Sequence, residues 1–175
     1  CPFVPTFLAH AARTPGADAV VTPEGRTSYH HLAGLAGAMQ RALRRTGSPE
    51  GPVAILSTDV VRRAAGILAA AACGRAVVLM DPARDPDALA AAAATIGART
   101  AIGEDPPDVF TGRIVTDGLA AGALEPTPVT ASTPFAYVST SGSTGDPRYV
   151  LRTHAAAGSA VGARVPYGTA DRVFR

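Results

Sequence analysis

The sequence predicts an α/β fold: a layered, mainly parallel sheet with helices on both faces. Short apolar runs that suit buried strands alternate with stretches whose apolar residues recur at helical spacing, almost throughout the 175 residues. A strand–helix–strand unit over 52–80 favours parallel pairing with a right-handed crossover. A glycine- and hydroxyl-rich loop follows a later strand, at the place where open α/β sheets bind ligands.

Length and composition fit one globular domain. A chain of 175 residues can bury a real core, and 47% hydrophobic with 17% charged residues excludes the disordered class. The net charge of +2 is too small to predict a nucleic-acid partner or a basic membrane patch. No apolar run reaches the length of a membrane span and the start lacks a signal peptide, so we expect a cytoplasmic protein.

The first part of the chain predicts a short helix, a hairpin and a longer helix. Ser28 is expected to cap the longer helix, and Gly47 to end it. His30 and His31 lie in its first turn, where we expect solvated or packed side chains rather than catalytic ones. The expected elements are a helix over 3–13, strands over 19–22 and 27–29, and a helix from 28 to 47.

The middle of the chain predicts strands and helices in alternation. Ser57 or Thr58 can cap the first of these helices, and Asp85 with Pro86 begins the second. Residues 118–134 lack a clear period and predict a loop with one helical turn at 119–121. The expected strands are 52–56, 76–80, 100–102 and 113–115, and the helices end at Gly74 and Gly97.

The stretch from Phe135 to His154 carries the strongest functional signal. An apolar strand over 135–138 turns into Ser-Thr-Ser-Gly-Ser-Thr-Gly at 139–145. The glycines allow a tight turn and a close approach, while hydroxyls and backbone amides supply donors that suit an anion such as a polyphosphate. Arg148 adds a fixed positive charge with a planar donor fork. Thr153 can cap a helix that begins near His154 and continues over 155–165, before a strand at 172–174.

A loop of this composition has other common roles. A Ser/Thr/Gly-rich segment is often a flexible surface loop, but the apolar strand before it and the apolar residues 149–151 after it favour a ligand loop. Its glycine spacing fits neither G-x-x-x-x-G-K-[ST] nor G-x-G-x-x-G, and no G-x-S-x-G occurs. All 16 basic residues are arginine, which excludes lysine chemistry from this chain, and we assign Cys1 and Cys73 no function.

TSGSTGDPR at 140–148 resembles the signature phosphate loop of the acyl-adenylate-forming (AMP-binding) superfamily, T-S-G-[ST]-T-G-x-P-[KR]-G. RTSYHHL and ACGRAVVLMDP resemble two earlier motifs of that family in the right order, and the chain is most similar to adenylation domains of non-ribosomal peptide synthetases. In the family this loop closes over the β- and γ-phosphates of ATP. Two departures are Arg148 where lysine is commoner and Tyr149, a bulky phenol, where glycine is usual. The resemblance implies a phosphate cradle made of Thr140, Ser141, Gly142, Ser143, Thr144, Gly145 and Arg148.

The resemblance also implies a function. It identifies part of the large N-terminal domain of enzymes that use ATP and Mg²⁺ to join an amino or other carboxylic acid to AMP, then pass the acyl group to a carrier-protein thiol. In the family, the residues for adenine, ribose, magnesium and the acid lie beyond this loop, as does a catalytic lysine. We therefore expect residues 1–175 to be an incomplete N-terminal segment, inactive alone, with no catalytic or metal-binding residue of its own.

Two roles stay open at this point. As a segment of an adenylating enzyme, the chain would work with the rest of its adenylation domain or megasynthase and with a carrier protein. As a non-catalytic remnant, it would be a structural or docking element in a non-ribosomal peptide or polyketide megasynthase. Neither the acid that is activated nor a pocket for it is visible in the sequence.

Overall fold

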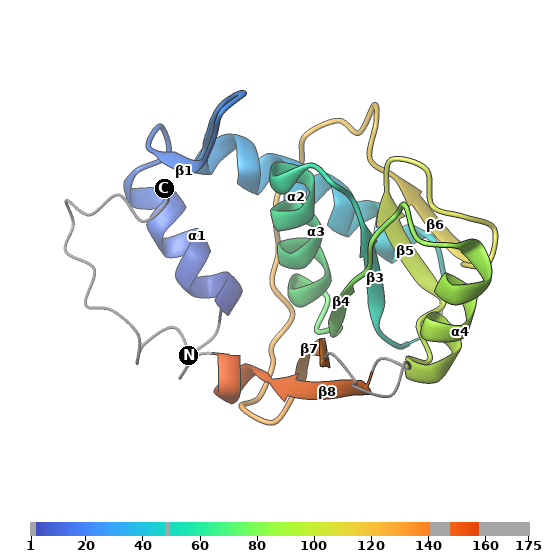
Figure 1. Ribbon diagram of the computed structural model, residues 1–175. Coiled ribbons are helices and arrows are strands. Elements are labelled where there is room, and N and C mark those ends of the chain that lie inside the picture. The colour runs from blue at the N-terminus through green and yellow to red at the C-terminus, as the bar shows by residue number, and fades with distance from the viewer. Residues whose placement is uncertain (1–2, 48–49, 141–147, 158–175) are drawn as a thin grey trace.

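The computed structural model describes residues 3–47, 50–140 and 148–157, and it shows an α/β fold (Figure 1). It contains a small β1–β2 hairpin and a six-stranded sheet, and helices flank the large sheet. The elements are α1 (Phe3–Arg13), β1 (Asp18–Thr22), β2 (Gly25–Ser28), α2 (Tyr29–Arg45), β3 (Val53–Leu56), α3 (Val60–Ala72), β4 (Val77–Leu79), α4 (Pro86–Ile96), β5 (Thr100–Gly103), β6 (Gly112–Val115), β7 (Pro134–Thr140) and β8 (Arg148–Thr153).

The large sheet is mainly parallel, as the sequence predicts. Its strand order is β6-β5-β3-β4-β7-β8, and only β8 runs antiparallel to its neighbour. Val53 of β3 lies opposite Val77 of β4 on one side and Thr100 of β5 on the other. β3 is therefore the central strand, which explains why all four of its residues are buried.

Helices cover both faces of this sheet, and successive residues of β3 show it. Val53 and Ile55 belong to the core shared with α2 and α3, whereas Ala54 and Leu56 belong to the core shared with α4. The α4 side is thin because that helix is rich in alanine and buries only Leu89, Ala92 and Ala93. The predicted two-faced arrangement is confirmed. No helix in the described ranges is long and apolar enough to cross a membrane.

Helix starts follow capping rules, with one correction. Ser28 caps α2 as predicted, accepting from the amide of His31 at 3.2 Å. The prediction of Ser57 or Thr58 for α3 is wrong: Asp59 is the cap and accepts from the amide of Arg62 at 2.9 Å. The Ser57 hydroxyl is engaged elsewhere, because it donates to a Glu104 carboxylate oxygen at 2.6 Å.

The connection between β6 and β7 is a loop held against α2. The helical turn predicted at 119–121 is absent, because the carbonyls of Ala120 and Ala121 accept from the Arg41 guanidinium at 2.6 and 3.3 Å instead of closing a turn. Gln40, which is buried, donates to the Glu125 carbonyl at 2.6 Å and accepts from its amide at 2.9 Å. The loop thus has a fixed course although it has no regular structure.

The C-terminal elements are described only at their start. Thr153 accepts from the amide of Ala156 at 3.3 Å, and helical residues begin at His154, as expected. The remainder of the helix predicted over 155–165 and the strand predicted over 172–174 lie outside the described residues.

Candidate functional site

The predicted phosphate loop joins the two strands of the β7–β8 hairpin. Thr140 and Arg148 are the last paired residues before the loop, and the Thr140 hydroxyl donates to the Arg148 carbonyl at 3.3 Å. Both residues are exposed. Of the predicted cradle, Ser141, Gly142, Ser143, Thr144 and Gly145 lie outside the described residues. The hairpin therefore brings the two ends of the predicted cradle face to face, with both side chains open to solvent.

The mouth of this hairpin lies at the carboxyl edge of the parallel sheet. β7 runs parallel to β4, with Ala136 opposite Val77 and Tyr137 opposite Val78. β7 consequently ends at the same edge as β3, β4 and β5, which is the edge where open α/β sheets bind ligands. The strand before the loop, β7, thus ends at the expected edge of the sheet, whereas residues 141–147 of the loop lie outside the described residues.

Tyr149, the unusual residue after the loop, packs on one face of the sheet. It lies opposite Ser139 in the β7–β8 register and is half-buried against the α4-side core, as is Tyr137. Because side chains alternate along a strand, the neighbouring Arg148 and Val150 face the other way. The Tyr149 side chain is thus accommodated against the α4-side core. Gly142 and Gly145, against which its direction would be judged, lie outside the described residues.

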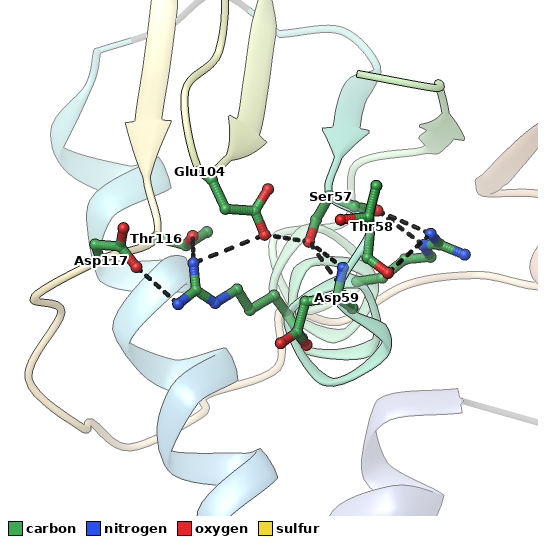
Figure 2. A network of polar contacts seen from close by, with 8 residues as sticks. Ser57, Thr58, Asp59, Glu104, Thr116 and Asp117 are labelled. Carbon is green, nitrogen blue, oxygen red and sulfur yellow. Dashed lines mark hydrogen bonds and ion pairs between the residues drawn. The ribbon is translucent and has the colours of Figure 1, made fainter. Parts of the chain in front are cut away.

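A polar network ties three neighbouring strand ends together at the same edge (Figure 2). Ser57 follows β3, Glu104 follows β5, and Thr116 with Asp117 follows β6. The Arg62 guanidinium donates to the Thr116 hydroxyl at 3.1 Å and lies 2.7 Å from an Asp117 oxygen and 3.7 Å from a Glu104 oxygen. The sequence reasoning missed this network. Its signal was the appearance of polar residues directly after three parallel strands, whose ends meet at one edge.

This network is a clasp rather than a binding site. Each charge has an opposite charge or a carbonyl beside it: Arg62 lies between Glu104 and Asp117, and Arg63 donates to the Ser57 carbonyl at 2.9 and 3.1 Å. Ser57 and Thr116 are buried, so their hydroxyls are used within the protein. The network holds the carboxyl ends of β3, β5 and β6 together.

The comparison with protein families agrees with this geometry. A family model described as AMP-binding enzyme matches residues 7–174, nearly the whole chain. The chain belongs to the AMP-binding enzyme family. The predicted family resemblance is thereby confirmed, and the β7–β8 hairpin is the described part of this AMP-binding chain that flanks its signature loop.

The chain spans less than half the length of the proteins that it matches. Pyochelin synthetase PchF of Pseudomonas aeruginosa is 33% identical over 157 residues, a match that covers 86% of this chain and 9% of PchF. The AMPPNP-bound form of the non-ribosomal peptide synthetase FmoA3 is 26% identical with a TM-score of 0.73, covering 86% of this chain and 17% of that one. The N-terminal subdomain of NpsA from Klebsiella oxytoca shares the fold, with a TM-score of 0.73, 22% identity, and coverage of 87% and 42%.

A buried histidine and a partly buried cysteine lie outside the hairpin mouth of this chain. His154 is 4% exposed, its ring contacts Phe135 edge-on at 5.0 Å between centroids, and neither ring nitrogen has a hydrogen-bond partner among the described residues. Burial lowers the pKa of His154 from 6.5, so its imidazole is neutral at pH 7. Burial raises the pKa of the Cys73 thiol above 9.0, which keeps it protonated.

The two histidines that were expected to be non-catalytic lie near the start of a helix. His30 and His31 are exposed in the first turn of α2. Within the described ranges, no group of three or more His, Cys, Asp or Glu side chains comes together in a way that could hold a metal ion.

Proposed function

We propose that this chain supplies the phosphate-binding part of an ATP-dependent adenylation domain, which activates an amino or other carboxylic acid as acyl-AMP for transfer to a carrier-protein thiol. The chain is the N-terminal segment of that domain, and it is not competent alone. Its partners are the remainder of the adenylation domain or megasynthase and a carrier protein.

One observation carries this proposal: Thr140 and Arg148 face each other at the mouth of the β7–β8 hairpin, exposed at the carboxyl edge of the sheet. The Arg148 guanidinium suits phosphate oxygens, because a planar fork can donate two parallel hydrogen bonds. In the sequence, Ser141, Gly142, Ser143, Thr144 and Gly145 lie between these two residues. A bound ATP analogue in FmoA3, at 26% identity, is in keeping with a nucleotide ligand.

The chemistry asks this chain to hold phosphates rather than to supply a nucleophile. A carboxylate oxygen of the acid attacks the α-phosphorus, the bond to the β-phosphate oxygen breaks, and pyrophosphate leaves. The carrier thiol then attacks the acyl carbon and AMP leaves. Charge neutralisation by Arg148 and orientation by the loop serve the first step, because pyrophosphate must be stabilised as it departs.

Mg²⁺ neutralises phosphate charge in reactions of this type. The described residues offer no cluster of three His, Cys, Asp or Glu side chains for it, so we assign Mg²⁺ no ligand among them. ATP, in contrast, fits the exposed donors at the hairpin mouth. The Mg²⁺ that the proposal requires would be held by the nucleotide and by residues outside the described part of the chain.

A second role is a non-catalytic structural or docking element in a megasynthase. The observation that favours it is Tyr149, a half-buried aromatic residue at a position next to the loop where the family usually has glycine. If the Tyr149 side chain fixed the hairpin in a shape that cannot bind phosphates, the chain would keep the signature sequence but would not bind ATP. Phosphate binding therefore separates the two roles.

The proposal is tested by measuring the binding of pyrophosphate to the 175-residue chain with phosphorus NMR or calorimetry. We expect weak binding in the millimolar range, about 4 kcal/mol, because the rest of the site is contributed elsewhere. Arg148→Ala should weaken binding by about fivefold through loss of a charge-assisted hydrogen bond. Arg152→Ala removes an equally exposed arginine of the same strand, farther from the loop, and should leave binding unchanged.

Absence of binding at high pyrophosphate concentration would favour the docking role instead. Equal losses in Arg148→Ala and Arg152→Ala would mean that the arginines attract pyrophosphate only by their general charge.

A further inference from the structure

β6 is an edge strand of the large sheet, at the side farthest from β8 (Figure 1). Among the described residues it pairs only with β5. The amides of Gly112 and Thr116 donate to the carbonyls of Arg99 and Gly103, at 3.0 and 2.9 Å. Because backbone groups alternate in direction along a strand, the amides of Arg113 and Val115 point to the open edge.

A cleft of about 550 Å³ runs along this open edge, between the last turns of α2, β6 and the loop at 118–120. Arg113, Ile114 and Val115 all line it. Side chains of consecutive strand residues point to opposite faces, so three consecutive lining residues mean that the backbone edge itself borders the cleft. Ile114 is buried, whereas Val115 is 48% exposed.

The cleft is basic. Its charged lining residues are Arg41, Arg45 and Arg113, and no carboxylate lines it, although the whole chain has a net charge of only +2. Arg41 donates to the Ala120 carbonyl at 2.6 Å, and Arg113 forms an ion pair with Asp108. Arg45 is exposed and forms no ion pair or hydrogen bond with any other described residue. At least one guanidinium is therefore available to a partner.

We propose that the free edge of β6 accepts an extended acidic segment of another polypeptide, which adds to the sheet as a further strand. Its backbone would pair with the outward amides and carbonyls of Arg113 and Val115, and its carboxylates would meet Arg45 and Arg41. Strand addition of this kind gains affinity from main-chain hydrogen bonds and selectivity from alternate side chains. The charge of the cleft argues for an acidic occupant, because every charged residue that lines it is an arginine.

The proposal differs from the usual explanation of such an edge. Short edge strands that carry a charged residue often serve only to prevent pairing between sheets. That explanation predicts an edge that rejects any added strand. The proposed edge, in contrast, takes an acidic strand and rejects a basic one, and it does not depend on phosphate binding at the β7–β8 hairpin.

A pair of labelled synthetic peptides tests this, one alternating glutamate and valine and the other alternating lysine and valine, with binding to the 175-residue chain measured by fluorescence anisotropy. We expect only the acidic peptide to bind, and we expect its affinity to fall as salt is added. Arg45→Glu should weaken binding by about tenfold, because it removes an attraction and adds a repulsion. Arg84→Glu makes the same charge change at an exposed position outside the cleft and should have little effect.

Amide hydrogen exchange locates the peptide. Binding should slow exchange at Arg113 and Val115, which have open-edge amides, more than at Ile114, whose amide already faces β5. The proposal is overturned if the acidic peptide does not bind, if Arg84→Glu weakens binding as much as Arg45→Glu, or if binding leaves the β6 amides unprotected.

Discussion

Single residues decide how this chain differs from a generic phosphate-loop protein. Tyr149 occupies a position that the family usually gives to glycine, and the structure places its ring against the α4-side core rather than in solvent. Arg148, one residue earlier, is exposed at the hairpin mouth. The alternation of the strand therefore places a packed side chain and a solvent-exposed one at two consecutive residues.

His154 makes the stability of the fold depend on pH. Its pKa in the folded state is below 6.5, the value for an exposed histidine in the unfolded chain. Between the folded and the unfolded pKa, the unfolded chain therefore binds more protons than the native one. Stability from this residue is fully present above pH 6.5 and is lost as pH falls through that range. We expect His154→Phe to lose less stability than the wild-type chain between pH 7 and pH 5, measured by urea unfolding. Equal losses would assign the acid sensitivity to other groups.

At the scale of elements, regular structure followed from the sequence wherever one physical signal dominated. Continuous apolar runs predicted the buried strands, and Asp85–Pro86 with Gly97 bounded α4 correctly. The α3 cap was misassigned because Ser57 looks like a cap in sequence, whereas Glu104, far along the chain, takes its hydroxyl. The course of the loop after β6 was likewise unpredictable, since long-range contacts with Gln40 and Arg41 set it.

Close packing of that loop on α2 gives a test of the contact between the two elements. A Cβ at Gly37 would lie 2.2 Å from the Gly122 carbonyl oxygen. Gly37→Ala should therefore lower the free energy of unfolding by about 2 kcal/mol, although alanine normally favours a helix by about 1 kcal/mol. Gly16→Ala meets no atom within 4 Å and serves as the control in the same urea titration. A stabilised Gly37→Ala would show that the loop does not press on α2.

At the scale of the whole molecule, the site was only partly predictable. The signature residues could be inferred because the motif has a characteristic composition. Their place after a strand could be inferred because a short apolar run predicts a buried strand. The pairing of Thr140 with Arg148 could not, since it depends on β8 folding back antiparallel on β7. The clasp at Arg62 was missed because it joins three strand ends that lie far apart in sequence.

We propose that this chain receives phosphates at the β7–β8 hairpin and not elsewhere on the carboxyl edge of the sheet. Backbone amide shifts during a titration with Mg²⁺-ATP test it most directly. We expect the largest shifts at Thr140 and Arg148, which flank the signature loop, and small ones at the clasp residues Arg62 and Glu104. Shifts concentrated at the clasp, with Thr140 and Arg148 unmoved, would contradict it.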